Sequence, residues 1–350
     1  MKTVNICTFN LENLYEIFKI FAFPASPKPL KKVLTPEELK EGGGFLPTPE
    51  WKNSFQLYNK GPWRNLSAAA IRRSEQNETS KYDMPDIVCL EEVESVEALR
   101  LFNERYLNNY YKYQLVIDSF DPRRIDVGVL SNFKMQSIIT HMFEPMSNEN
   151  QDYVFNRDCL EISFEITKNK NLTIFLNHLK SKFVSPFTPK EKVQQEIKKA
   201  NALRLLQATR VKKIVSSRFK VDRFDKENFV VLGDFNDTPT STFVLPLIVN
   251  SGMKNALSRI DPKERWTHWW DSKNIVSQID YILLSPNLDL NSTSKPYIER
   301  RGISNRIKKF SYLNEKNEEN NIKWDIKRFN DISDNYEASD HCPIFLELRI

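Results

Sequence analysis

The chain has 350 residues, of which 40% are hydrophobic, 12% aromatic and 28% charged, and its formal net charge is +5. This composition excludes a chain too polar to bury a core and allows one large domain or two. The mild positive charge fits a phosphate-bearing partner without identifying one. Four cysteines lie far apart without CxxC spacing, which predicts free thiols in a reducing compartment and argues against a disulfide framework or a zinc site.

The first residues, Met1 to Asn10, lack the continuous apolar core and the small-residue cleavage site of a secretory signal peptide. The apolar run Ile17 to Phe23 is interrupted by Lys19 and is too short to span a membrane. We therefore expect a cytoplasmic protein without stable membrane insertion, although an alternative secretion route would leave no trace in this sequence.

Short apolar runs and helical spacings alternate along the first half of the chain. Ala68-Ala-Ala70 favours a helix, and Ser95 is suited to cap the helix that follows it. In chain order we expect a strand at Val4–Phe9, a helix at Arg64–Ser74, a strand at Ile87–Leu90, a helix at Ser95–Tyr106, and strands at Tyr113–Ile117 and Val127–Leu130.

The second half contains further apolar runs and one long helical pattern. The expected elements are strands at Cys159–Ile166 and Leu172–Leu176, a helix at Lys190–Lys213, and strands at Phe229–Leu232, Ser277–Leu284 and Ile344–Leu348. The window 190–220 holds ten Lys or Arg residues against two Glu, which fits either a nucleic-acid-binding face or an ordinary solvated helix.

Two segments interrupt this pattern. Residues 24–62 contain seven prolines and Gly42-Gly-Gly44, which predicts an irregular insertion that could cover a site as a lid. Residues 303–331 are polar and predict a loop. No tandem repeat or domain boundary is visible, so we expect a single domain over 1–350, of the α/β class with mixed sheets.

The central motif runs from Phe229 to Pro239. Four apolar residues predict a buried strand, and Gly233 is followed by Asp234, Asn236 and Asp237 at the strand's exit. An apolar strand that delivers carboxylate and amide oxygens to its end is a common way to build an active site on a sheet. The simpler interpretation is a strand followed by an ordinary Asp- and Asn-rich turn.

Five further apolar segments carry polar clusters of the same chemical type at one end. The clusters are Asn10 with Glu12, Glu91 with Glu92, Asn177 with His178, Asp280, and Asp340 with His341. Carboxylates and amides with two histidines, and no thiolate cluster, favour a hard cation, so we expect Mg²⁺ or Mn²⁺ rather than Zn²⁺. Magnesium sites of this kind leave positions open for substrate phosphate, which predicts phosphoryl chemistry.

Six short motifs occur in one order along the chain: Thr8-Phe-Asn-Leu-Glu12, Leu90-Glu-Glu-Val93, Asn177-His-Leu-Lys-Ser181, Gly233-Asp-Phe-Asn236, Ile279-Asp-Tyr-Ile282 and Ser339-Asp-His-Cys-Pro343. In this order the sequence resembles the endonuclease/exonuclease/phosphatase superfamily of DNase I-like enzymes. The resemblance implies a four-layer α/β/β/α sandwich of two mixed β-sheets, with the site at one edge of the sheets.

The resemblance also implies roles for individual residues. The metal-side residues are Glu92 as principal ligand with Asn10, Glu12 and Asp340. The catalytic residues are Asp234, Asn236, His341 held by Asp280, and His178 with Asp126 as the residue that orients it. The substrate-binding residues are Asn177, Lys180 and Asn236.

Other residues near these motifs are less clear from sequence. His341 on its own would favour a buried, hydrogen-bonded histidine, whereas within the set of six motifs it favours a catalytic role. Glu91 stands where the family usually has Gln, and like-charge repulsion there would raise a neighbouring pKa. His268 lies among tryptophans and is expected to pack or to stack against substrate, while His141 is expected at the surface.

These observations predict a Mg²⁺- or Mn²⁺-dependent phosphodiester hydrolase, most plausibly a nuclease that cleaves DNA or RNA. An alternative is a phosphatase or phospholipase-C-like phosphodiesterase that acts on phosphoinositide, sphingomyelin or a nucleotide. A non-catalytic binding module is the third hypothesis, which the filled set of expected positions disfavours. Nucleic acid is the expected partner, and no protein partner is predicted.

Overall fold

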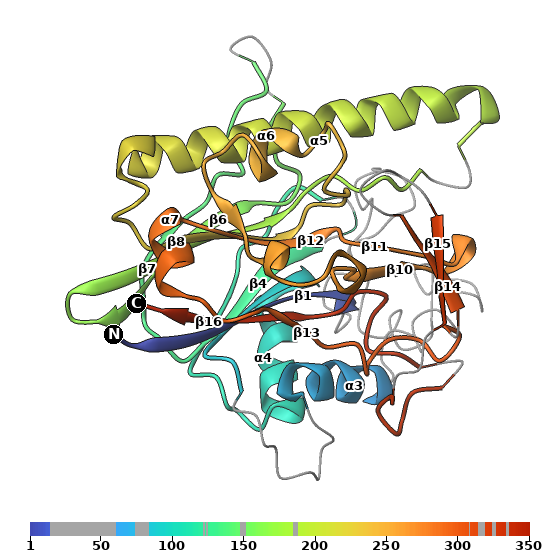
Figure 1. Ribbon diagram of the computed structural model, residues 1–350, viewed down its shortest axis with the longest axis horizontal. Coiled ribbons are helices and arrows are strands. Elements are labelled where there is room, and N and C mark those ends of the chain that lie inside the picture. The colour runs from blue at the N-terminus through green and yellow to red at the C-terminus, as the bar shows by residue number, and fades with distance from the viewer. Residues whose placement is uncertain are drawn as a thin grey trace, which may run out of the picture.

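Two six-stranded mixed sheets pack face to face in the computed structural model, with helices on both outer faces (Figure 1). The structure describes residues 1–14, 61–73, 84–121, 123, 125–147, 152–184, 188–307, 309–313, 319–323, 327–333 and 336–350. Within these residues, no helix combines the length and the apolar character that a membrane crossing requires.

The first sheet has the order β13-β16-β1-β2-β4-β3. Its strands are β1 (Thr3–Leu14), β2 (Ile87–Val93), β3 (Tyr113–Val116), β4 (Asp126–Ser131), β13 (Tyr297–Ile298) and β16 (Ile344–Arg349). Strand β1 runs parallel to β2 and antiparallel to β16, so the two ends of the chain share the middle of this sheet.

The second sheet has the order β5-β6-β7-β8-β12-β9. Its strands are β5 (Met135–Ile139), β6 (Cys159–Thr167), β7 (Lys170–His178), β8 (Phe229–Asp234), β9 (Lys254–Asn255) and β12 (Asp280–Leu284). Strands β7 and β8 are parallel, and β12 is antiparallel to β8. His178, Asp234 and Asp280 therefore stand side by side at one register level across three adjacent strands.

Side-chain alternation along the strands divides the core into layers. In β7, Ile174 and Leu176 point between the two sheets, where they join the largest hydrophobic cluster. Phe175, between them in sequence, lies in a separate cluster under the helices of the second sheet. This alternation also decides which residue at the end of β7 can enter the site.

Helices cover both outer faces of the sheets. Helices α3 (Gly61–Arg72) and α4 (Val96–Tyr106) pack on the first sheet, and α5 (Lys190–Phe219) and α6 (Leu245–Ile248) pack on the second. The short helix α7 (Pro286–Asn291) follows β12, and single 3₁₀ turns lie at Val221–Arg223, Ala256–Arg259, Pro262–Glu264 and Asp271–Lys273. The expected four-layer sandwich is therefore confirmed.

The predicted polar loop at 303–331 is wrong in part. It contains β14 (Lys309–Leu313) and β15 (Glu319–Lys323), which pair with each other and extend β10 (His268–Trp270) and β11 (Ile275–Ser277) into a separate sheet of order β10-β11-β14-β15. Strand β15, Glu-Asn-Asn-Ile-Lys, was missed because its sequence lacks an apolar pattern and it gains its register from pairing; the short alternation in β14, Lys-Phe-Ser-Tyr-Leu, was overlooked within a polar segment.

Some of the other differences concern boundaries. The long helix extends six residues beyond Lys213 to Phe219, and the first helix begins at Gly61. The Ser95 hydroxyl accepts a hydrogen bond from the Ala98 amide at 3.2 Å, so the predicted N-cap is confirmed. The insertion expected at 24–62 lies outside the described residues except for 61 and 62, which begin α3.

Candidate active site

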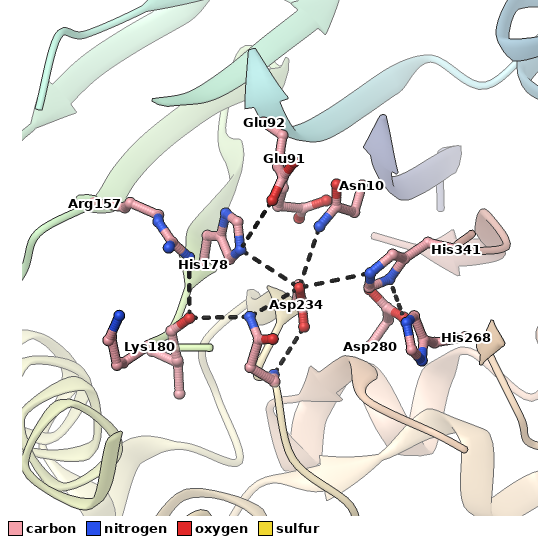
Figure 2. A network of polar contacts seen from close by, with 12 residues as sticks. Asn10, Glu91, Glu92, Arg157, His178, Lys180, Asp234, His268, Asp280 and His341 are labelled. Atoms are coloured by element: carbon pink, nitrogen blue, oxygen red, sulfur yellow. Dashed lines mark hydrogen bonds and ion pairs between the residues drawn. The ribbon is translucent and has the colours of Figure 1, made fainter. Parts of the chain in front are cut away.

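The ends of β1, β2, β7 and β8 and the start of β12 meet at one edge of the sandwich (Figure 2). Pairing becomes irregular there, between Asn10 and Leu14 and between Glu91 and Val93. Four non-glycine residues at this edge adopt left-handed backbone angles, with φ of 48° at Glu12, 72° at Asn13, 64° at Glu92 and 55° at Asn236. Such bulges and strained angles re-aim side chains and concentrate at functional sites.

Asp234 is the hub of the site. Its Oδ1 accepts a hydrogen bond from the Asn236 amide at 2.7 Å, and its Oδ2 accepts from Asn236 Nδ2 at 3.0 Å and from Asn10 Nδ2 at 3.2 Å. Asn10 belongs to the other sheet, so this contact joins the two sheets across the site. Burial raises the pKa of Asp234 to about 7, the Asp280 charge adds to the rise, and His341 opposes it.

Asp280 and His341 form a second buried pair. The imidazole Nδ1 lies 3.0 and 3.1 Å from the two carboxylate oxygens of Asp280, and the Thr267 hydroxyl donates to the same carboxylate at 2.6 Å. The free Nε2 points toward Asp234 Oδ2 at 3.9 Å. Burial lowers the pKa of His341, but the Asp280 carboxylate outweighs it and holds that pKa well above its usual range.

The expected metal-side residues lie beside this pair. Glu12 Oε2 accepts a hydrogen bond from the Asp340 amide at 3.1 Å, and Asn10 Oδ1 accepts from the Glu12 amide at 3.0 Å. Glu92 Oε1 lies 3.5 Å from the Arg123 guanidinium and 3.9 Å from His178 Nε2. Burial, with the nearby charge of Asp340, raises the pKa of Glu12 well above its usual range.

A divalent cation fits the chemistry of these donors. Glu91 is fully buried, and its Oε2 has no hydrogen-bond partner among the described residues. Burial and the charges of Asp280 and Asp234 raise the pKa of Glu91 well above its usual range. Several buried carboxylates at one edge are costly unless a cation compensates them. The described residues also contain two groups of three possible ligands whose ligand atoms lie within 4.8 Å of one another: Asp234, Asp280 and His341, and His268, Asp340 and His341.

His178 enters the site, but without the partner expected for it. Its Nε2 lies 3.5 Å from Asp234 Oδ2, whereas its buried Nδ1 has no hydrogen-bond partner among the described residues. Asp126 instead accepts hydrogen bonds from the amide and hydroxyl of Ser119, at 2.8 and 2.6 Å. The prediction that Asp126 orients His178 is therefore wrong. Burial and the charge of Arg157 lower the pKa of His178 well below its usual range.

Asn177 does not face the site. It follows the same alternation as Phe175, stands opposite Cys159 in the β6–β7 register, and donates its side-chain amide to the Phe175 carbonyl at 3.0 Å. The prediction that Asn177 binds substrate is wrong, because neighbouring residues of a strand point to opposite faces.

Lys180 lies beside the site, just after β7. Its amide donates to Gln207 Oε1 at 2.7 Å, and its side chain is partly buried. Burial and the nearby guanidinium of Arg157 lower the pKa of Lys180. Cationic groups thus converge here, although no contact in the structure tests the substrate-binding role of Lys180.

Arg157 was not predicted from the sequence, and His268 was expected only to pack or to stack against substrate. Arg157 is buried, pairs with Asp121 at 2.7 Å and donates to the Leu179 carbonyl at 3.2 Å, which also accepts from Asn236 Nδ2. His268 lies with its ring centroid 4.7 Å from that of His341. Neither residue belongs to a strand-end motif, and the only available signal for His268 was the scarcity of histidine, with four in the chain.

Comparison with known proteins agrees with this architecture. The model of the endonuclease/exonuclease/phosphatase family matches residues 53–341, while no curated protein matches significantly in sequence. Truncated Caenorhabditis elegans TDP2 superposes with a TM-score of 0.53 at 15% identity, covering 99% of this chain and 98% of that one.

Two further solved structures share the fold. SmcL has a TM-score of 0.52 at 12% identity, covering 99% of each chain. Sphingomyelinase C from Streptomyces griseocarneus has a TM-score of 0.51 at 12% identity, covering 100% of each chain. At these identities the superpositions show the fold alone, and the family match extends over most of the sequence. The chain belongs to the endonuclease/exonuclease/phosphatase family, whose members are phosphodiester hydrolases.

Proposed function

We propose that this protein is a metal-dependent phosphodiesterase that cleaves nucleic acid. The observation that carries the hydrolytic part is the opposition of two buried units: Asp234 with Asn236, and His341 held by Asp280, with 3.9 Å between Asp234 Oδ2 and His341 Nε2. A phosphoryl group bound against both units would meet an acceptor for the proton of the attacking water at Asp234 and a hydrogen-bond donor at His341.

Each side chain has a defined part in this proposal. Asp234 takes the proton of the attacking water, which its pKa of about 7 suits at neutral pH. His341 carries a proton, because Asp280 raises its pKa, and donates Nε2–H to a phosphoryl oxygen. The two hydrogen bonds of Asn236 Nδ2, to Asp234 and to the Leu179 carbonyl, hold its amide in place next to the reacting centre.

The metal-side residues complete the site. Glu92, Glu12, Asn10 and Asp340 would hold Mg²⁺ or Mn²⁺, which when bound neutralises charge on the phosphoryl oxygens. His178 stays neutral near pH 7, because burial lowers its pKa, and can share a hydrogen bond with substrate without adding positive charge.

An exposed aromatic trio supports nucleic acid as the substrate. Phe120, Phe143 and Tyr153 are 47%, 57% and 39% exposed and lie with their ring centroids 5.1–5.6 Å apart. Phe120 is next in sequence to Asp121, which pairs with the buried Arg157. Aromatic rings next to cations suit the bases and phosphates of a single strand.

A lipid phosphodiesterase is the second candidate, since the same three rings would also suit a membrane interface. The structural neighbours include a sphingomyelinase C. A shared fold alone does not assign that activity to this chain.

Hydrolysis of a substrate panel tests these proposals. The panel contains plasmid DNA, single-stranded DNA, RNA, a simple phosphodiester, and sphingomyelin or phosphoinositide vesicles, with Mg²⁺ or Mn²⁺. Asp234→Ala and His341→Ala are assayed beside the parent, and His141→Ala serves as a control outside the site. Metal-dependent cleavage of nucleic acid that only the two site variants lose is the expected result. Turnover of lipid alone would select the second candidate, and no turnover on the panel would contradict both.

A further inference from the structure

His341, which Asp280 holds, also belongs to a second group of three side chains, together with His268 and Asp340. His268 Nε2 lies 3.6 Å from Asp340 Oδ2, and His341 Nε2 lies 3.9 Å from Asp340 Oδ1. The carboxylate thus presents one oxygen to each imidazole. All three ligand atoms lie within 4.8 Å of one another.

The backbone holds this group in place. His268 and His341 form an isolated antiparallel bridge, and the Trp269 amide donates to the Asp340 carbonyl at 3.0 Å. On the other side, the Cys342 amide donates to the Thr267 carbonyl at 2.6 Å. Both segments are therefore pinned on either side of the cluster, and its geometry does not depend on a free loop.

Asp280 prepares His341 as a ligand. It engages Nδ1 at 3.0 Å and leaves Nε2 free, 3.9 Å from both Asp340 Oδ1 and Asp234 Oδ2. A carboxylate on one ring nitrogen, with the other nitrogen on the metal, is the usual arrangement around metal-binding histidines. The hydrogen bond between Asp280 and His341 Nδ1 is an observation separate from the spacing of the three proposed ligands.

The distances fit ligands better than they fit direct hydrogen bonds. Separations of 3.6 and 3.9 Å exceed the range of N–H···O bonds. Two ligand atoms that each lie about 2.0–2.2 Å from a shared ion can stand up to about 4.4 Å apart, so each of these two pairs taken singly is within the span of a bound ion. The side chain of Asp340 is 36% exposed and that of His268 is 15% exposed, so an ion can enter from solvent.

We propose that His268, Asp340 and His341 form a second divalent-cation site that selects a borderline ion such as Zn²⁺ or Co²⁺ over Mg²⁺. Two imidazole nitrogens and one carboxylate suit such ions, whereas the carboxylate and amide oxygens around Glu92 suit Mg²⁺. Asp340 is the one residue that the two sites would share. Because the ion occupies His341 Nε2, it removes the donor on which hydrolysis depends, so zinc should inhibit. Only this last consequence rests on the proposed function; the binding does not.

Zinc titration by calorimetry tests the site directly. Tag-free protein is titrated with Zn²⁺ in millimolar Mg²⁺, and Co²⁺ is added to a second sample to record its visible ligand-field spectrum. We expect one ion per chain. Since changes even to outer-shell partners cost about 10–100-fold in metal affinity, His268→Ala should weaken zinc binding by at least about tenfold and change the cobalt spectrum.

Two control variants make the result specific. His141→Ala removes a histidine that pairs with Glu161 and is not part of the proposed site, so this variant should leave zinc binding unchanged. Glu92→Ala should also retain zinc, which separates this site from the magnesium ligands. Thiolates do not offer a rival site, because all four cysteines are buried.

Three results would overturn the proposal: no zinc binding in the presence of Mg²⁺, displacement of zinc by Mg²⁺, or unchanged affinity in His268→Ala. Circular dichroism tests whether His268→Ala folds. If it does not fold, the titration is repeated with His268→Gln, which keeps a side chain in that space. In a separate assay, zinc should inhibit Mg²⁺-supported hydrolysis by the parent more than that by His268→Ala. An inactive parent would contradict the proposed function while leaving the binding result intact.

Discussion

Replacing Asp280 by asparagine removes the charge that holds His341 without changing the size of the side chain. Nδ1 lies 3.0 and 3.1 Å from the two carboxylate oxygens, within the range of a charge-assisted hydrogen bond. Such a bond contributes about 1.5–3 kcal/mol, and each 1.36 kcal/mol of barrier is tenfold in rate. If that stabilisation is expressed in the transition state, kcat should fall by about 10- to 150-fold.

The Asp280→Asn variant should also change the pH dependence of the reaction in a defined direction. In the parent the pKa of His341 is raised, so its active, protonated form persists above neutrality and is lost as pH rises through that pKa. Without the Asp280 charge the pKa falls, and the alkaline loss of activity should move to lower pH.

Steady-state kinetics across pH, on whichever panel substrate the parent cleaves, measure both effects. Asp222→Asn, at an exposed position after α5, makes the same chemical change away from the site and should leave the profile unchanged. A parent-like kcat in Asp280→Asn, or an alkaline limb that does not move, would refute the assignment of His341 as a protonated donor held by Asp280.

Three further predictions concern substrate, backbone and metal. Phe143→Ala should weaken binding of single-stranded nucleic acid by about 1–3 kcal/mol without affecting hydrolysis of a simple phosphodiester. Leu290→Ala, at an exposed apolar residue on α7, should leave nucleic-acid binding unchanged, and equal KM values for the two variants would contradict the stacking role. Gly233→Ala should prevent normal folding or activity, because the added Cβ would lie 2.0 Å from the Asn177 carbonyl oxygen. Gly252 also has a positive φ, but a Cβ there would lie 3.7 Å from its nearest neighbour, so Gly252→Ala should lower the free energy of unfolding by only about 1–2 kcal/mol. Exhaustive chelation should abolish hydrolysis and Mg²⁺ or Mn²⁺ should restore it; turnover that survives chelation would exclude the metal-dependent mechanism.

Most of the site residues could be predicted from sequence because strand ends carry strong local signals. Asp234, Asn236, Asp280 and His341 each follow or begin an apolar run, and the structure brings them together around one point. The error at Asn177 was avoidable in principle: His178 is its neighbour on a strand, so both could not face the site.

Other features depended on pairing between distant segments. His268 and Asp340 are 72 residues apart and meet only because a bridge links their segments. The partner of Asp126 is Ser119, close in sequence, rather than the distant His178 that the motif suggested. Side-chain partners of this kind have no periodicity, so the sequence carries no signal for them.

The amino-acid sequence by itself determined the class of fold, the strands and helices with strong apolar periodicity, and the set of carboxylates, amides and histidines at the strand ends, because these depend on local patterns. The tertiary structure alone decided which of these groups meet. The reason is geometric: the register of three adjacent strands brings His178, Asp234 and Asp280 to one level, and the irregular pairing at Asn10–Leu14 and Glu91–Val93 lies in the other sheet at the same edge. Contacts set by strand pairing also placed His268 beside Asp340, where a second cation can be tested.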